Sequence, residues 1–224
     1  MKRITLLGLA GLFLIMPVAA WAEAEHEEKV FVEREGLVKV EAEDFVTQEK
    51  DEVRKWHLTT EEKTPDIAPD GDENHAAEAS GKAYIEILPD TRRTHDDQLI
   101  RGENFSNEPG RLAVISYPVR FETPGRYYVW VRAYSTGTED NGIHVGLNGE
   151  WPESGQRMQW CDGKHSFRWE SKQRTQEKHC GEPYKIYLDI PAPGVHVVSF
   201  SMREDGFEFD CWLMTQERDY QPAP

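Results

Sequence analysis

The sequence is short of cysteine, of positive charge and, beyond its first residues, of long apolar runs. Three of its 224 residues are Cys, and 26 Lys and Arg face 41 Asp and Glu, giving a formal net charge of −15. An acidic surface repels phosphates, which argues against nucleic acid as a partner. It also disfavours attraction of highly sulfated or uronate-rich polymers by bulk charge. Neutral ligands, or a site where Ca²⁺ offsets the carboxylates, remain compatible with this composition.

The N-terminal segment has the pattern of a secretory signal peptide. Lys2 and Arg3 precede an apolar run over Ile4–Val18, and Ala20 and Ala22 supply small residues before the expected cleavage site. A membrane anchor is the alternative, although the run is shorter than the ~20 residues that a span needs. We expect cleavage near Ala22 and a soluble secreted or periplasmic protein. Removing the two basic residues takes its net charge from −15 to near −17.

Three cysteines allow one disulfide and one leftover thiol in an oxidising compartment. Cys161 and Cys180 bracket a polar, irregular segment, where a bridge would hold a loop. Cys211 lies in an alternating run, on the face expected to carry Phe207, Phe209 and Leu213. We therefore expect a Cys161–Cys180 disulfide and a buried Cys211 thiol, with three reduced cysteines as the alternative.

The segment 125–134 alternates strictly between two faces, which predicts a β-strand rather than a helix. One face carries Tyr127, Val129, Val131 and Ala133, and the other carries Tyr128, Trp130, Arg132 and Tyr134. Similar strand-like runs, separated mostly by Gly and Pro turn signals, cover Val30–Val32, Leu37–Ala42, Ala83–Leu88, Leu112–Phe121, Ile143–Leu147, Tyr184–Ile190, Val195–Met202 and Phe207–Met214. Short strands without an amphipathic helix predict an all-β fold, an antiparallel β-sandwich.

Three long connections interrupt these strands. Glu61–Gly81 is rich in Asp, Glu and Pro, so we expect it to be mobile. Ile100–Arg111 and Glu150–Gly181 contain aromatic and charged residues, and long loops in a compact domain are often functional. The expected organisation is a signal peptide (1–22), an N-terminal extension (23–36), one sandwich domain (37–216) and a C-terminal tail (217–224).

Three ordered motifs resemble those of a known family of carbohydrate-binding domains. They are Val40-Glu41-Ala42-Glu43-Asp44-Phe45, Pro124-Gly125-Arg126-Tyr127-Tyr128-Val129-Trp130-Val131-Arg132-Ala133 and Phe207-Glu208-Phe209-Asp210-Cys211-Trp212-Leu213. Over roughly 37–216 the chain resembles the galactose-binding-domain-like β-sandwich (jelly roll) of carbohydrate-binding module families 6 and 35. It is also similar to the C-terminal domain of family 115 glycoside hydrolases. It departs from them in the Trp-rich segment Glu150–Gly181, in its two loop cysteines and in the long Glu61–Gly81 connection.

The resemblance implies a structural Ca²⁺ held by Glu41, Glu43 and Asp210. Two carboxylates at i and i+2 point to the same side of a strand, and a hard cation prefers several oxygen ligands. An ordinary solvated acidic face is the alternative in a chain with 41 acidic residues.

An aromatic platform is the first candidate ligand site. Sugar rings present apolar C–H faces that stack on aromatic side chains. The candidates are Trp151, Trp160, Trp169 and Tyr134. The alternative is that the three indoles form a small satellite core beneath their loop. We expect Trp130 and Trp212 to pack within the sandwich instead.

Polar residues near the same edge are the second set of candidates. In the families that the chain resembles, this edge carries the sugar site, which implies ligand contacts from Glu139, Asp140 and Asn141, and Arg132 could reach it. The alternatives are a hairpin turn for the first three and a buried carboxylate partner for Arg132. Two further candidate ligand contacts, in the Ile100–Arg111 connection, are Arg101 and Asn104.

No hydrolase, lyase or metalloprotease motif accompanies these residues. We therefore expect a secreted, non-catalytic protein that binds a polysaccharide or oligosaccharide by ring stacking and hydrogen bonds. A carbohydrate-active enzyme could be its partner. The alternatives are a small sandwich-fold hydrolase or lyase, and a structural or interaction module without a sugar site.

Overall fold

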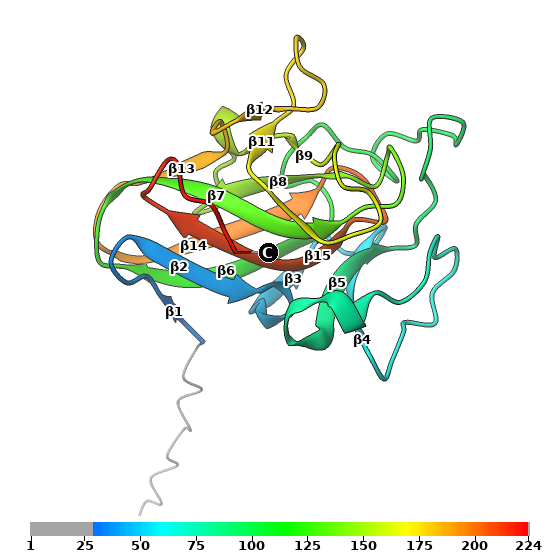
Figure 1. The fold of residues 1–224 in the computed structure, drawn as a ribbon, viewed down its shortest axis with the longest axis horizontal. Coiled ribbons are helices and arrows are strands. Elements are labelled where there is room, and N and C mark those ends of the chain that lie inside the picture. Colours follow the sequence, from blue (N-terminus) through cyan, green and yellow to red (C-terminus); the bar gives the residue numbers. More distant parts are fainter. Residues whose placement is uncertain (1–28, 224) are drawn as a thin grey trace, which may run out of the picture.

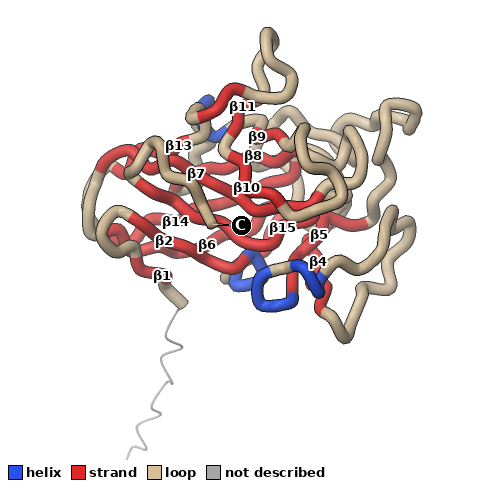
Figure 2. Tube along the Cα trace, viewed as in Figure 1, coloured by secondary structure: helices blue, strands red, loops and turns tan. Residues whose placement is uncertain are grey.

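The computed structural model describes residues 29–223, so the expected signal peptide lies outside the described residues. Within that range, no helix is long and apolar enough to cross a membrane. Four short 3₁₀ helices accompany the strands: η1 (Ala42–Asp44), η2 (Ala76–Glu78), η3 (Ser80–Lys82) and η4 (Glu153–Gly155). Figure 2 shows that strands and loops make up almost all of the fold.

The first sheet has eight strands. Its main order is β1-β6-β14-β8-β9-β11-β12, and β3 also pairs with β6. The bounds are β1 (Phe31–Val32), β3 (Thr47–Glu49), β6 (Val114–Phe121), β8 (Gly142–Leu147), β9 (Met158–Gln159), β11 (Lys172–Gln173), β12 (Glu182–Pro183) and β14 (Gly194–Met202). The β1–β6 pair is parallel, whereas β14 lies antiparallel to both β6 and β8.

The second sheet has seven strands. Its main order is β10-β7-β15-β5-β4, with β13 pairing to β7 and β2 pairing to β15. The bounds are β2 (Leu37–Glu41), β4 (Lys55–Thr60), β5 (Ala83–Leu88), β7 (Gly125–Tyr134), β10 (Arg168–Glu170), β13 (Tyr187–Ile190) and β15 (Glu208–Thr215). All the pairs in this sheet are antiparallel.

The two sheets stack face to face and enclose one main core (Figure 1). The inward face of β7 supplies Tyr127, Val129, Val131 and Ala133, as its alternation predicts, and each is at most 1% exposed. Between the sheets, Tyr117 packs edge to face with Phe200 and with Trp212, and the Phe200 and Trp212 rings are tilted to each other. The prediction of an all-β sandwich is therefore confirmed, and so is the packing role of Trp212.

A β-bulge in β15 changes which side chains face the core. Phe209 pairs with Ala133 and Cys211 pairs with Arg132, so Asp210 is an extra residue between them. After the bulge, Trp212 and Met214 join the core, while Cys211 shares the outward face with Leu213. The expectation that Cys211 shares a face with Phe207 and Phe209 is wrong because it assumed uninterrupted alternation. Cys211 is nevertheless a buried free thiol, as expected.

The connection between β4 and β5 is packed against the protein. It contains η2 and η3, and its residues Ala76 and Ala79 join a small cluster with Tyr84, Tyr134 and Phe167. The interpretation of this acidic connection as a mobile loop missed that packing. At the other end of the described chain, two residues of the expected N-terminal extension form β1.

Candidate functional site

The expected aromatic platform is not assembled in the structure. Trp160 is only 1% exposed, its ring packs 5.0 Å from the Phe207 ring, and its Nε1 donates to the Arg168 carbonyl. Tyr134 is 5% exposed and stacks on His75 at a centroid distance of 3.8 Å. The expectation that Trp160 and Tyr134 stack on a ligand is wrong, since neither ring is open to one.

The other two indoles lie in separate places. Trp151 borders a cavity of about 420 Å³ on the outer face of the eight-stranded sheet, beside Val197 and Ser199. Trp169 is half-buried, donates to the Ala223 carbonyl at 2.8 Å and shares a cavity of about 260 Å³ with Trp130. Trp130 therefore lies on the outer face of the seven-stranded sheet rather than in the core. A ligand role for Trp151 and Trp169 stays a prediction.

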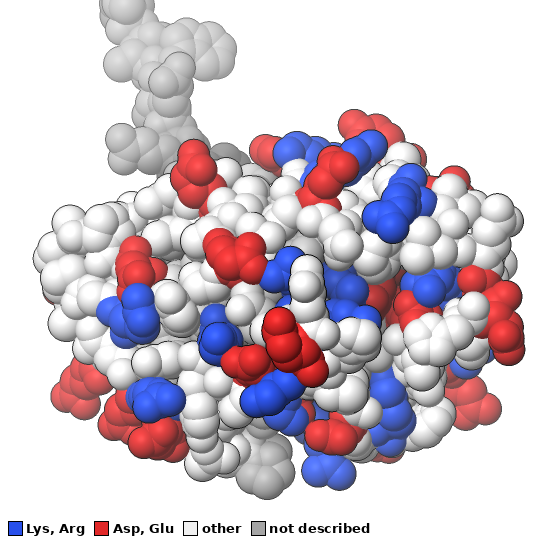
Figure 3. Space-filling view, turned by 90° about the horizontal axis from the view of Figure 1, so that it is seen from above, with Lys and Arg blue, Asp and Glu red and all other residues white. Residues whose placement is uncertain are grey.

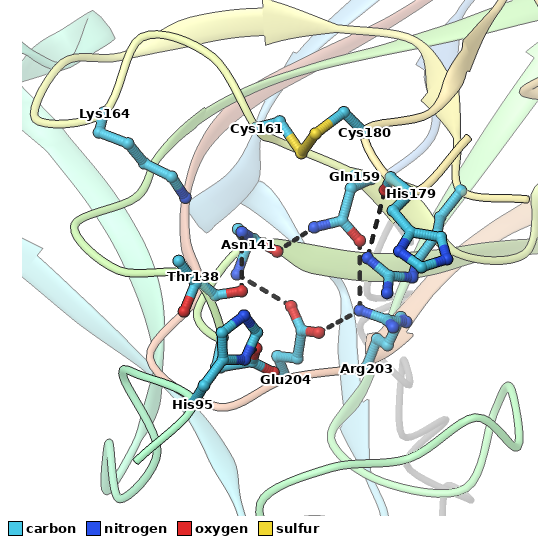
Figure 4. Close-up of a pocket in the computed structure, with 12 residues that line it drawn as sticks. His95, Thr138, Asn141, Gln159, Cys161, Lys164, His179, Cys180, Arg203 and Glu204 are labelled. Carbon is cyan, nitrogen blue, oxygen red and sulfur yellow. Dashed lines mark hydrogen bonds and ion pairs between the residues drawn. A yellow bond between two sulfur atoms is a disulfide. The ribbon is translucent and has the colours of Figure 1, made fainter. Parts of the chain in front are cut away.

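A cavity of about 380 Å³ lies beside the disulfide, which joins Cys161 and Cys180 as expected. We call this space the polar cavity (Figure 4). Its walls come from the β5–β6 connection, the loop before β8, β9 and the loop after it, the loop before β12, and the turn between β14 and β15. The lining residues are His95, Thr138, Glu139, Asn141, Gln159, Cys161, Lys164, Arg174, His179, Cys180, Arg203 and Glu204.

A connected set of hydrogen bonds fixes one wall of the polar cavity. The Gln159 amide donates to Asn141 Oδ1, and Arg203 Nη1 donates to Gln159 Oε1 at 3.4 Å. Arg203 also pairs with Glu204, whose other oxygen accepts the Asn141 backbone N–H at 3.1 Å. All four side chains are at most 5% exposed. Their donors and acceptors are thus held in place before any ligand arrives.

Two further basic side chains of the polar cavity, Lys164 and Arg174, are incompletely paired. Lys164 Nζ lies 3.9 Å from Asp140 Oδ1 and also donates to Ser135 Oγ. Arg174 donates to the His179 carbonyl at 3.2 Å and makes no ion pair with a described residue. Burial lowers the pKa of both Lys164 and Arg174. Acidic and basic side chains are interspersed on the face shown in Figure 3, so the overall negative charge does not dictate the local one.

The loop 135–141 is built largely on its own hydrogen bonds. Asp140 is 1% exposed and accepts from Ser135 Oγ at 2.6 Å and from the backbone N–H groups of Thr136 and Gly137 at 2.8 and 2.7 Å. The expectation of a ligand contact for Asp140 is wrong, because the turn uses its oxygens. Asn141 does line the polar cavity, as its predicted role requires.

Glu139 also lines the polar cavity, but its carboxylate is paired with Arg92 and His95. Arg132 pairs with the buried Asp210, which confirms the alternative weighed for it.

The two candidates in the Ile100–Arg111 connection do not reach the polar cavity. Asn104 is 1% exposed, donates to the Gln98 carbonyl at 2.9 Å and accepts from the Ile100 N–H at 2.8 Å. Its expected ligand contact is wrong, since it holds the loop together. Arg101 is exposed, and its guanidinium lies 6.0 Å from the Phe105 ring.

Sequence reasoning missed Gln159, Lys164, Arg174, Arg203 and Glu204. The first three lie in the segment that was singled out for its tryptophans. The last two lie in the turn between β14 and β15. No local pattern links these positions, because the fold brings them together from separate loops.

Two of the carboxylates expected to bind Ca²⁺, Glu41 and Asp210, lie close together beneath the β4–β5 connection, in a group whose third member is Cys211 rather than Glu43. Ser80 donates through Oγ to Glu41 Oε1 at 2.9 Å and through its backbone N–H to Asp210 Oδ1 at 2.7 Å. Glu41 Oε2 and Glu43 Oε2 are buried without a hydrogen-bond partner. Burial, with the nearby negative charges of Glu41 and other carboxylates, raises the pKa of Glu43 to about 7. These donors fit a hard cation, although Arg132 neutralises part of the charge.

No protein-family profile matches this chain. The curated proteins include a relative from Formosa agariphila named "Uncharacterized protein P23", which is 61% identical over 193 residues. The match covers 86% of this chain and 47% of the relative, so the chain spans about half the length of that protein.

Several solved structures show a more distant likeness. The family 35 carbohydrate-binding module of Clostridium thermocellum is 14% identical, with 80% of this chain and 96% of that chain covered and a TM-score of 0.42. The family 35 module of Paenibacillus barcinonensis is 13% identical, with coverages of 80% and 99% and a TM-score of 0.45. The C-terminal family 6 module of the laminarinase LamC from Zobellia galactanivorans is 13% identical, with 80% of this chain and 99% of that chain covered and a TM-score of 0.41. These are modules of the two families that the sequence motifs resemble.

Proposed function

We propose that this chain is a secreted or periplasmic binding protein that holds an oligosaccharide, or part of a polysaccharide, in the polar cavity without cleaving it. The observation that carries the proposal is the preset wall of Asn141, Gln159, Arg203 and Glu204 beside an open space of about 380 Å³. That volume falls in the range of small-molecule sites. Sugar hydroxyls both donate and accept hydrogen bonds, so a wall of amide, guanidinium and carboxylate groups complements them.

The leftover positive charge narrows the ligand class. Arg174 has no carboxylate partner among the described residues, and the nearest one to Lys164 is 3.9 Å away. A carboxylate or sulfate on the sugar would supply the missing partner through a charge-assisted hydrogen bond. The proposed ligand is therefore an anionic saccharide, a class that bulk charge alone had disfavoured.

The state of the carboxylates supports binding without catalysis. A glycosidase of the usual kind needs two carboxyl groups flanking the bond, one of them protonated to act as an acid. In the polar cavity, Glu139 is paired with Arg92 and His95, and Glu204 is paired with Arg203. Both carboxylates are thus already engaged by basic side chains of the protein, which suits a fixed binding wall better than an acid that must reach a glycosidic oxygen.

Calorimetric titration with neutral, uronate-bearing and sulfated oligosaccharides tests the proposal. We expect dissociation constants of about 10–1000 µM for an anionic ligand, because a wet site gains little beyond the entropy cost of binding. Arg174→Ala should weaken binding about tenfold, the loss of one charged contact. Arg120→Ala, an exposed arginine on β6, is the matched control and should bind normally.

Two results would overturn the proposal. One is a folded protein that binds none of these sugars at millimolar concentration. The other is release of new reducing ends from any of them.

We also propose a structural Ca²⁺ at Glu41, Glu43 and Asp210. The two orphaned carboxylate oxygens there support it. Adding Ca²⁺ to chelator-treated protein should raise the melting temperature, and Glu43→Gln should reduce that rise. If Ca²⁺ leaves the melting temperature unchanged, the proposal of a structural Ca²⁺ at these residues fails.

A further inference from the structure

Two glutamates on neighbouring strands face each other on the outer side of the seven-stranded sheet. Glu86 of β5 and Glu208 of β15 are direct cross-strand partners, and they are 2% and 1% exposed. Like charges at directly opposed positions destabilise a sheet. Burying them increases the cost, because a buried charge needs a partner.

The β4–β5 connection adds more acidic groups above this pair. Ligand atoms of Asp72, His75 and Glu208 lie within 4.8 Å of one another, and so do those of Asp70, Asp72 and Glu86. Stacking on Tyr134 at 3.8 Å fixes the His75 ring. We call Asp70, Asp72, His75, Glu86 and Glu208 the acidic cluster.

The acidic cluster has too few protein partners for its charge. Both carboxylate oxygens of Glu208, and Asp70 Oδ1, are buried without a hydrogen-bond partner. Among the described residues, the one basic side chain within 4 Å of these carboxylates is His75, whose Nε2 lies 3.7 Å from Glu208 Oε1 and 3.9 Å from Asp72 Oδ2. Four carboxylates thus face a single imidazole.

We propose that the acidic cluster binds a Ca²⁺ ion, held by carboxylate oxygens of Asp70, Asp72, Glu86 and Glu208 between the sheet and the β4–β5 connection. Calcium takes six to eight oxygen ligands at 2.3–2.6 Å. The four carboxylates offer oxygen ligands only, which suits this ion. Zinc favours nitrogen and sulfur ligands, and magnesium keeps several of its waters and is usually bound through one or two carboxylates.

This site is separate from the carboxylates Glu41, Glu43 and Asp210. It uses β5, the first residue of β15 and the middle of the connection, whereas the other set uses β2, η1 and the bulge of β15. Burial raises the pKa of both Glu86 and Glu208, as expected for groups that require a cation or a proton. In the absence of a cation, protons shared among the carboxylates are the competing explanation.

Calcium titration of chelator-stripped full-length protein at pH 8 distinguishes these explanations. We expect Glu208→Gln to remove one equivalent of bound Ca²⁺, or to weaken that step about tenfold or more through loss of a charged ligand. Asp72→Asn, a change on the connection rather than within a strand, should do the same and guards against misfolding of the first variant. Glu43→Gln should leave this step intact, and the exposed Glu122→Gln should behave as wild type.

The proposal fails if both Glu208→Gln and Asp72→Asn retain the wild-type number of bound Ca²⁺ ions. It also fails if chelator-stripped protein binds Zn²⁺ but not Ca²⁺. In that case the Zn²⁺-binding step would be lost in His75→Ala and kept in Glu86→Gln. Neither outcome depends on whether the polar cavity binds a saccharide.

Discussion

The polar cavity and the acidic cluster balance their charges in opposite ways. In the polar cavity, both lining carboxylates are ion-paired, and the group without a carboxylate partner is Arg174. In the acidic cluster, four carboxylates share one histidine. One space is open to solvent beside a disulfide, and the other is closed beneath a connection that packs on the sheet.

This difference shows that unpaired local charge is a better guide to a ligand than net charge. The chain carries −15 overall, yet the polar cavity contains two incompletely paired basic side chains, Lys164 and Arg174, that suit an anion. The acidic cluster has the opposite excess and suits a cation. Each region therefore has its own expected response to mutation, reduction and pH.

Removing the Trp160 ring should have the largest effect on the free energy of unfolding. Trp160→Ala should cost about 3–5 kcal/mol of unfolding free energy, because it leaves a hole in the core beside Phe207. Urea denaturation measures this loss. The half-buried Trp169→Ala is the matched control and should cost about 1 kcal/mol or less. Equal losses in the two variants would contradict the assignment of Trp160 to the core.

Removing the disulfide should weaken ligand binding in the polar cavity and leave the acidic cluster unaffected. The bridge closes a loop with a sequence separation of 19, so the double variant Cys161→Ser, Cys180→Ser should lose about 3 kcal/mol. Saccharide binding should fall, because both cysteines line the polar cavity, while Ca²⁺ binding at the acidic cluster should persist. Parallel titrations of the folded variant with sugar and with Ca²⁺ check this. Loss of both activities together would show that the regions are coupled.

Acid should weaken the sheet beside the polar cavity through His144. Its Nε2 lies 3.1 Å from the Ser106 carbonyl, its Nδ1 accepts from the Arg157 N–H at 3.0 Å, and burial lowers its pKa to about 3. The unfolded chain binds this proton near pH 6.5, so its contribution to stability is complete above that pH and is lost as the pH falls toward 3.

The slope from this one group is at most about 1.4 kcal/mol per pH unit. Denaturation of wild type and His144→Gln between pH 7 and 4 isolates it, because all other groups are common to both proteins. Wild type should lose stability faster with acid than the variant. Parallel pH curves would rule out a buried neutral His144.

The alternation of apolar and polar residues predicts most of the fold. Alternation at period two located β5, β6, β7, β8 and β14, because each has one apolar face against the core. It did not locate β3, the six-residue β4 or the short strands β9 to β12. β3 and β9 to β12 have two or three residues each, so tertiary contacts rather than a local pattern determine their pairing. β4 is an edge strand whose Trp56 alone joins the main core, so it lacks a continuous apolar face.

The candidate site was harder to predict, because residue type does not reveal depth. Trp160 and Trp169 occur in the same polar segment, yet one is sealed in the core and the other is half-buried near the C-terminal end of the described chain. Asp140 looked suited to a ligand and instead completes its own turn. The acidic Glu61–Gly81 connection looked mobile because composition cannot show that its carboxylates meet others from β5 and β15.

The extra residue Asp210 divides β15 into two segments, each with its own alternation. Phe209 and Trp212 both face the core although they are three positions apart, and the extra residue makes this possible. Deleting Asp210 would restore continuous pairing with β7 and leave Trp212 and Met214 in the core, but it would remove the buried carboxylate that pairs with Arg132. Homologous strands of this domain therefore have to be superimposed as two segments, one on each side of that position, before any equivalence of residues is drawn.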